Sequence, residues 1–224
     1  MTGIGMRAKS PITIDGPAGA GKGTLAVRLA ARLGFAHLDT GKLYRAVGLA
    51  VLRAGGDPAD AAAAVAAARA LDAAAIAAGA LADPELAGDR AAAAASKVAA
   101  IPAVRQALLD FQRDFAAHPP GGAAGAVLDG RDTGTVVCPG APAKFFVTAS
   151  AEVRAERRHK ELLARGEASI YALVLAEIRE RDERDSSRAV APLKPAADAC
   201  LIDTSAMDAD AVLATALDLL GVSA

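Results

Sequence analysis

The fold is decided by nine residues, Gly16-Pro17-Ala18-Gly19-Ala20-Gly21-Lys22-Gly23-Thr24. A short apolar run, residues 12–14, precedes them, and Leu25, Leu29 and Leu33 recur at helical spacing after them. Strand, glycine loop and helix in this order form the context in which G-x-x-x-x-G-K binds nucleotide phosphates. Glycines let the backbone turn several N–H groups toward one point, and the helix N-terminus and the lysine add positive charge. The stretch therefore predicts a phosphate-binding loop rather than a bare glycine-rich turn.

The composition suits a single domain, 1–224. Hydrophobic residues make up 53% of the chain, but many are alanines in runs such as 61–64 and 91–95, which favour helix. Aromatic residues are only 3% and Trp is absent, so recognition of bases by stacked aromatic rings is not expected. The net charge of −1 argues against nucleic acid as a partner.

The sequence also bears on location and on the cysteines. No charge-free run of 18 or more apolar residues could span a membrane. Arg7 and Lys9 are not followed by an apolar segment before Pro11, so no secretory signal is expected. We expect a cytoplasmic monomer with no membrane partner. Cys138 and Cys200 lack metal-ligand spacing and are expected to be small buried hydrophobes.

Apolar runs alternate with helical patterns along the chain, which predicts a parallel sheet with helices on both faces. Strands are expected at residues 12–14, 35–38, 126–128, 144–147 and 200–202. Helices are expected at 22–33, from about 42, from 57 to about 71, at 89–100, from 102, and near 150–165, 169–185 and 208–220. Residues 118–122 predict a loop, and 72–90 show no clear period.

Three of these helices carry detailed expectations. Asp57 and Pro58 are expected as the N-cap and first residue of one of them. The helix after residue 41 is expected to present one apolar face, made of Leu43, Val47, Ala50 and Val51. The helix from Pro102 is expected to carry an apolar stripe of Val104, Leu108, Phe111 and Phe115.

The segment Asp39-Thr40-Gly41-Lys42-Leu43-Tyr44-Arg45 follows the second expected strand. It places a hydroxyl, a phenol and an arginine fork at the start of a helix, which suits a second phosphate or a sugar. The residues alone support equally well a simple helix start, with Asp39 or Thr40 as N-cap and Tyr44 half-buried.

The segment Asp129-Gly130-Arg131-Asp132-Thr133-Gly134 follows another buried strand. Two carboxylates and an arginine at a strand end are costly to pack unless they serve a ligand. The alternative is an Asx-turn with a surface ion pair.

Residues 179–188 are dense in both signs of charge. In a helix, Arg181, Asp185 and Arg188 share one face, and such a face is usually solvated. A nucleotide implied by the glycine loop favours a binding face instead. The preceding helix offers three arginines that we expect to meet this face in one cluster: Arg154, Arg157 and Arg158.

These segments together resemble the nucleoside monophosphate kinases, and among them the bacterial cytidylate kinases. The similarity runs from about residue 11 to 220 and rests on the order and spacing of segments 13–24, 39–45, 96–105, 129–137 and 180–193. It implies an α/β P-loop kinase with about five parallel strands. It also implies a core (11–40, 121–155 and 190–224), a monophosphate-binding region (41–118) and a lid (156–189).

The resemblance implies transfer of a phosphoryl group from ATP, with Mg²⁺, to CMP or dCMP in pyrimidine nucleotide metabolism. Residues 16–24 would hold the ATP phosphates. The implied catalytic residues are Lys22, Arg131, Arg157 and Arg188. The implied CMP-binding residues are Thr40, Tyr44, Arg45 and Arg131 at the phosphate, Ser96, Arg105 and Asp132 at the cytosine edge, Arg181 and Asp185 at the sugar, and Arg188 at the base or phosphate. A carboxylate that accepts from the exocyclic amine favours cytosine over uracil.

Two features depart from the family pattern. Gly23 stands where the general P-loop has a Mg²⁺-binding Ser or Thr, so direct ligation by the chain is not expected and Thr24 is the only candidate. Residues 72–90 are alanine-rich and shorter than the insert with β character that bacterial cytidylate kinases carry, so cytosine contacts or closure there are expected to differ.

Three other functions stay open at this point. One is another small-molecule P-loop kinase, such as an adenylate or shikimate kinase. A P-loop switch NTPase would carry a guanine-reading N-K-x-D, which the sequence lacks. A nucleic-acid-binding protein is disfavoured by the net charge.

Overall fold

A computed structural model of the chain describes residues 10–77 and 79–222. The chain divides into two compact units, described separately here: one runs up to Leu38 and from His118 onward, and the other is Asp39–Ala117. No helix in the described ranges is long and apolar enough to cross a membrane. The expectation about a secretory signal concerns residues 1–10, of which 1–9 lie outside the described residues.

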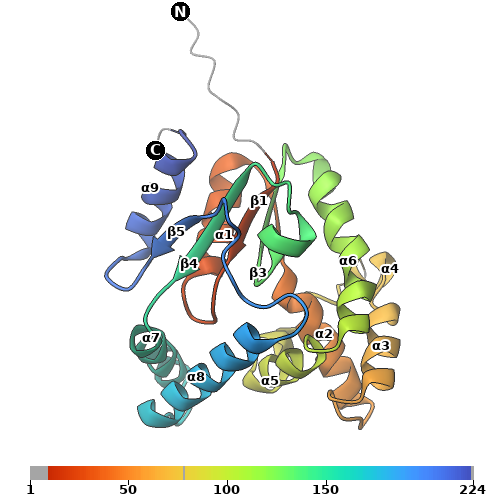
Figure 1. Cartoon of the computed structure of the whole chain (residues 1–224). Helices are drawn as coiled ribbons and strands as arrows, with labels where there is room; N and C mark the ends of the chain where they lie inside the picture. Colours follow the sequence, from red (N-terminus) through yellow and green to blue (C-terminus); the bar gives the residue numbers. More distant parts are fainter. Residues whose placement is uncertain (1–9, 78, 223–224) are drawn as a thin grey trace, which may run out of the picture. The chain divides into compact units, whose positions relative to one another are not determined.

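The first unit is built on a five-stranded sheet in the order β2-β3-β1-β4-β5 (Figure 1). Its strands are β1 (Ile12–Asp15), β2 (Ala36–Asp39), β3 (Ala126–Gly130), β4 (Ala143–Thr148) and β5 (Cys200–Asp203). β1 pairs in parallel with β3 and with β4, and β4 pairs in parallel with β5. β1 and β3 are buried along their whole length, which explains why Ile12 and Ile14 in β1 and residues 126–128 in β3 are apolar. The predicted parallel α/β fold is confirmed.

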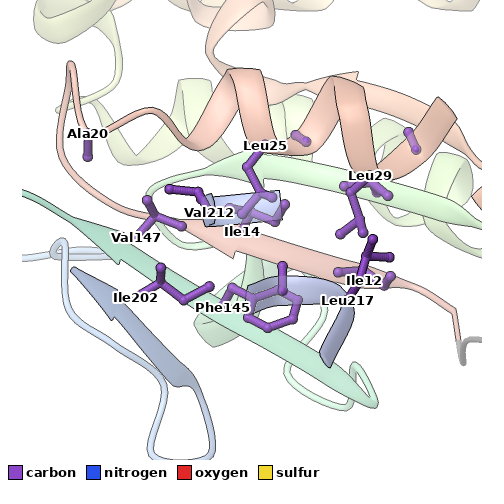
Figure 2. Close-up of a cluster of buried hydrophobic side chains, with 14 residues drawn as sticks. Ile12, Ile14, Ala20, Leu25, Leu29, Phe145, Val147, Ile202, Val212 and Leu217 are labelled. Atoms are coloured by element: carbon purple, nitrogen blue, oxygen red, sulfur yellow. The ribbon is translucent and has the colours of Figure 1, made fainter. Parts of the chain in front are cut away.

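The helices of this unit also lie where the sequence placed them. They are α1 (Lys22–Leu33), α7 (Ala151–Ala164), α8 (Tyr171–Ser187) and α9 (Ala209–Leu219), with short helical turns η2 (Pro120–Gly122) and η3 (Thr133–Val137). Leu25 and Leu29 of α1 pack with Val212 and Leu217 of α9 over the side chains of Ile12, Ile14, Phe145 and Val147 (Figure 2). This core fixes the start of α1, and with it the glycine loop, at the carboxyl end of β1.

The turn η3 lies against the other face of β1. Because side chains alternate along a strand, Thr13 and Asp15 point away from the face that carries Ile12 and Ile14. A Cβ at Gly134 would stand 2.9 Å from Thr13 Oγ1, so the turn approaches the strand as closely as a glycine allows. One strand, β1, therefore supports the glycine loop on one side and the segment after β3 on the other.

The described part of the second unit is helical (Figure 1). It contains α2 (Thr40–Arg53), α3 (Ala61–Ala70), α4 (Ala73–Ala77), η1 (Pro84–Ala87), α5 (Asp89–Val98) and α6 (Pro102–Ala117). Gly48 of α2 lies so close to α5 that a Cβ there would be 2.7 Å from Ala94 Cβ. Small residues thus bring α2 and α5 into tight contact. The described residues within 72–90 form α4 and η1 and no strand.

The expected start of one helix in this unit was wrong in detail. Asp60, not Asp57, caps α3, since its carboxylate accepts from the amides of Ala62 and Ala63 at 2.8 and 3.3 Å. The Asp57 carboxylate accepts from the amide of Ala59 at 3.0 Å and closes a turn before the helix. Both aspartates suit the N-cap position, but only Asp60 directly precedes Ala61, the first residue of α3.

The expected apolar faces were also partly wrong. Ala50 is exposed, because α2 uses Gly48 for its second contact face. The stripe expected on α6 is confirmed for Val104 and Leu108, which are buried, and for Phe111, which is half-buried and packs against the same core; Phe115 is half-buried as well. Neither cysteine is a buried hydrophobe: Cys138 is half-buried and Cys200 is exposed on the edge strand β5.

Candidate functional site

The glycine loop joins β1 to α1 through backbone that only glycine adopts easily. Gly16 has φ +153°, and a Cβ there would stand 1.9 Å from the carbonyl oxygen of Val147. Gly19 and Gly21 have φ of +76° and +89°, and Gly21 is the N-cap of α1. Lys22 is therefore the first residue of the helix. The positive φ values are the loop geometry that the sequence predicted.

The loop is held from behind by Arg154, which lies in the first turn of α7 and is 4% exposed. Its Nη1 donates to the carbonyl of Ala18 at 3.2 Å, and its Nε donates to the carbonyl of Ala149 at 2.9 Å. Nη1 and Nη2 also form a two-pronged ion pair with Asp182 of α8, at 3.0 and 2.5 Å. One guanidinium thus joins the loop, α7 and α8.

A cavity of about 240 Å³ opens beside the loop, lined among others by Gly21, Thr24, Arg157 and Met207. Arg157 is fixed at its wall, since Nη1 donates to Thr204 Oγ1 at 3.0 Å and Nη2 to the Thr204 carbonyl at 2.7 Å. The Thr204 hydroxyl in turn donates to the carbonyl of Ala20 at 2.9 Å. The cavity is thus bounded by the loop on one side and by the segment after β5 on the other.

The oxygen ligands near the loop are few. Among the described residues, no group of three or more His, Cys, Asp or Glu side chains is placed to hold a metal ion. Thr24 is exposed and carries a hydroxyl. The carboxylate of the buried Asp129 is engaged by His37, with Oδ1 at 2.7 Å from Nε2. This donor set fits a Mg²⁺ ion that takes most of its ligands from phosphates and water.

The segment after β3 is anchored by Asp15, which is 4% exposed. Asp15 Oδ1 accepts from the amide and the hydroxyl of Thr133, and Oδ2 accepts from the amide of Gly134, each at 2.8 Å. Burial raises the pKa of Asp15 to about 6; the three hydrogen bonds oppose this rise, and the nearby Asp132 adds to it. The segment is therefore a buried, anchored structure, and the alternative of an Asx-turn with a surface ion pair was wrong.

Arg131, in the same segment, points to α8. Its Nε donates to Asp185 Oδ2 at 2.8 Å and its Nη1 to the carbonyl of Gly130 at 3.1 Å. Burial raises the pKa of Asp185, but the charges of Arg131, Arg188 and Arg181 and the hydrogen bond from Arg131 outweigh burial and hold it below its ordinary value. The carboxylate is thus ionised and surrounded by arginines.

The predicted face of α8 is confirmed in outline. Asp185 is buried, and Arg181 precedes it by one helical turn. Arg188 is the C-cap residue of α8, and its Nη2 lies 4.0 Å from Asp185 Oδ1. The predicted cluster with α7 was wrong for Arg157, which faces Thr204. Arg154 meets α8 through Asp182, and Arg158, one helical turn after Arg154, also pairs with Glu161 on its own helix.

The remaining predicted residues lie together in the second unit. Tyr44 is buried, and the guanidinium carbon of Arg105 lies 5.3 Å from the centre of its ring. Nη1 of Arg45 donates to the carbonyl of Leu86 at 2.6 Å. Asp39 is the N-cap of α2, as the alternative of a simple helix start predicted. Tyr44, which that alternative expected to be half-buried, is buried.

Two further residues of this unit complete the set. Ser96 on α5 has a buried hydroxyl with no hydrogen-bond partner among the described residues. Thr40 is buried at the first turn of α2. A buried hydroxyl without a hydrogen-bond partner is costly, so that of Ser96 calls for a water or a ligand as its partner.

The comparisons with known proteins agree on the family. The model of the family described as cytidylate kinase matches residues 12–221. A cytidylate kinase of Paramagnetospirillum magneticum is 64% identical over 210 residues, which cover 94% of this chain and 97% of that protein. The chain belongs to the cytidylate kinase family.

Other relatives give the same result. A cytidylate kinase of Rhodospirillum rubrum is 63% identical over 209 residues, covering 93% of this chain and 96% of that protein. A crystal structure of an uncharacterized protein from Eubacterium ventriosum matches with a TM-score of 0.54 at 13% identity, covering 95% and 98% of the two chains, which shows a shared fold. Membership in the cytidylate kinase family makes this chain a phosphotransferase that acts on nucleotides.

Some site residues were missed by reasoning from the sequence. Asp182, Thr204 and His37 form the contacts of Arg154, Arg157 and Asp129 described above. Asp182 lies in the charged run 179–188, but no local pattern marks Thr204 or His37. Asp15 carried a signal that was not used: a carboxylate at the end of a buried strand needs hydrogen-bond donors nearby.

Proposed function

We propose that this protein transfers the γ-phosphoryl group of ATP to CMP and dCMP. The observation that carries the proposal is the glycine loop, whose geometry suits the phosphates of one nucleotide, within a chain that belongs to the cytidylate kinase family. The acceptor phosphate is already an anion at neutral pH, so the reaction needs positioning and charge neutralisation more than a strong base.

The donor side is assigned to the first unit. Residues 16–24 would surround the ATP phosphates with backbone N–H groups, and Lys22 would add a charge at the outer phosphates. Arg157, a catalytic residue in the resemblance, lines the cavity of about 240 Å³ beside the loop and would act on the donor nucleotide there. Mg²⁺ would arrive on the ATP phosphates, where it supplies neutralising charge, and Thr24 is the hydroxyl that could hold it.

The acceptor residues are those that the family resemblance implies. Thr40, Tyr44, Arg45 and Arg131 would bind the phosphate of CMP, and Arg181 and Asp185 would bind the sugar. Arg188 would bind the base or the phosphate and help neutralise the transferring group. Ser96, Arg105 and Asp132 would read the cytosine edge. The unpartnered Ser96 hydroxyl supports this assignment, because a hydrogen bond to the base would satisfy it.

The test is a coupled assay with ATP and a panel of acceptors: CMP, dCMP, UMP and AMP. We expect kcat/KM for CMP and dCMP to exceed that for AMP by several orders of magnitude. A preference for AMP would overturn the proposal. We further propose that the enzyme is a cytoplasmic monomer, which light scattering tests against the chain mass of 22.4 kDa.

A further inference from the structure

Asp15 lies outside every role assigned above, although it links the two parts of the first unit that would meet the two nucleotides. It is the residue directly before the glycine loop, and its side chain accepts three hydrogen bonds from Thr133 and Gly134. Both oxygens are engaged, and both point away from the core under α1. Its position therefore connects the donor loop with the segment that carries Arg131 and Asp132.

The backbone of Asp15 makes the connection two-sided. In the β1–β3 register Asp15 lies opposite Gly130, the residue before Arg131. Its carboxylate holds Thr133 and Gly134, the residues after Asp132. One residue therefore fixes the chain on both sides of Arg131-Asp132.

The turn after Asp132 needs this carboxylate. η3 closes through the amides of Val136 and Val137, which donate to the carbonyl of Asp132 at 2.9 and 3.2 Å. As in any first helical turn, its leading amides have no carbonyl partner within the turn. The Asp15 carboxylate accepts from them instead, and the close fit of Gly134 against Thr13 keeps the turn on the strand.

We propose that Asp15 is a positioning residue for base selection: by holding Thr133 and Gly134 it sets the direction of the Asp132 carboxylate toward the acceptor base. The inference rests on the proposed function, in which Asp132 reads the cytosine amine. A base-reading group that moves by a fraction of an ångström loses much of its discrimination, because its hydrogen bond is directional.

The test compares Asp15→Asn and Thr133→Val with the matched control Thr135→Val, which changes a threonine in the same turn. An asparagine keeps the shape of Asp15 but presents an N–H₂ group to one of the donors. Thr133→Val removes only the hydroxyl donor and keeps both amide bonds. For each variant we would measure kcat/KM for CMP and for UMP, the KM for ATP, and the circular dichroism spectrum.

We expect the CMP-to-UMP ratio of kcat/KM to fall at least tenfold in Asp15→Asn and severalfold in Thr133→Val. In both variants the KM for ATP should stay within about threefold of the wild-type value, because the lost hydrogen bonds hold the segment of Asp132, which would contact the acceptor. A merely structural role would lower activity with both acceptors equally. An unchanged ratio in folded Asp15→Asn, or a ratio that falls equally in Thr135→Val, overturns the inference.

Two outcomes keep the inference separate from the proposed function. If wild-type enzyme prefers an acceptor other than CMP, the proposed function fails and the base-selection role fails with it. If the wild type prefers CMP but the variants keep its ratio, only the role of Asp15 fails. Should Asp15→Asn not fold, Thr133→Val decides: a ratio equal to that of Thr135→Val overturns the inference, and a lower ratio supports it.

Discussion

The buried carboxylate of Asp15 makes the stability of this protein depend on pH in an unusual direction. Burial raises its pKa to about 6 from the ordinary value of 3.8, so between these values the folded protein binds a proton that the unfolded chain has lost. Stability from this group is therefore fully present below pH 3.8 and is lost as the pH rises through 6. Asp15→Asn removes the titration, so the wild type should lose stability relative to the variant as the pH rises.

The size of the effect follows from the two pKa values. At 1.36 kcal/mol per pKa unit, the full change is about 3 kcal/mol. Acid unfolding limits the accessible range, and between pH 5 and 7.5 the change should be about 1.4 kcal/mol. That is well above the error of a comparison of denaturation midpoints in urea at constant slope.

The assay is urea unfolding of wild type and Asp15→Asn at several pH values, followed by circular dichroism. The difference in unfolding free energy, wild type minus Asn variant, should fall steadily with rising pH and level off above pH 7. Asp185→Asn is the control. Because the pKa of Asp185 is held below its ordinary value of 3.8, its contribution to stability is lost only as the pH falls below that value, so this difference should stay constant between pH 5 and 7.5.

A flat difference for Asp15→Asn between pH 5 and 7.5 would refute the reasoning. It would mean that the three hydrogen bonds from Thr133 and Gly134 offset or exceed the cost of burial, since in either case Asp15 would already be ionised at pH 5. The hydrogen bonds, and not burial, would then decide the charge of Asp15.

The other predictions concern single residues. Lys22→Met should lower kcat by at least about 10²–10³ with an unchanged circular dichroism spectrum, and near-normal turnover would contradict the assignment of the loop. Gly21→Ala should lower the unfolding free energy by about 1–2 kcal/mol, because only φ is strained, and Gly16→Ala by about 3 kcal/mol or more, because its Cβ also meets a β4 carbonyl; urea titration that finds equal losses would refute this. Ser96→Ala should raise the KM for CMP about tenfold and leave the KM for ATP unchanged. Arg157→Ala should do the reverse in the same steady-state assay, and a raised KM for CMP alone would place this arginine at the acceptor.

The strands, the helices of the first unit and the glycine loop could be predicted because each is encoded locally. β1 carries the apolar Ile12 and Ile14, α1 repeats leucines at helical spacing, and Gly34 ends that helix with φ +67°. Local signals failed where two of them competed. Asp57 and Asp60 are both good caps, and the sequence does not say which one has the helix in front of it.

The contacts that organise the site could not be predicted, because their partners are far apart in the chain. Asp15 and Thr133 are 118 residues apart, and Arg157 and Thr204 are 47 apart. Such pairs form only once the sheet order is set, and no periodicity in the sequence records them. The same holds for α7: Arg154 reaches Asp182 of α8 and Arg157 reaches Thr204, although the sequence pattern placed both arginines toward α8.

The ion pair between Arg131 and Asp185 affects the free energy with which the site would bind a phosphate group. A free arginine loses about 2 kcal/mol of side-chain entropy when it is ordered, and a ligand that orders it bears that cost. Arg131 is already ordered by Asp185 and by the carbonyl of Gly130. Under the proposed function, its guanidinium would therefore meet CMP in a fixed direction, and the entropy would have been lost on folding. The Asp185 carboxylate also lowers the net positive charge of the site. The arginines would therefore attract other polyanions less strongly than they would without it. Fixed direction, and not the sum of positive charge, is then what this site would contribute to the recognition of a nucleotide.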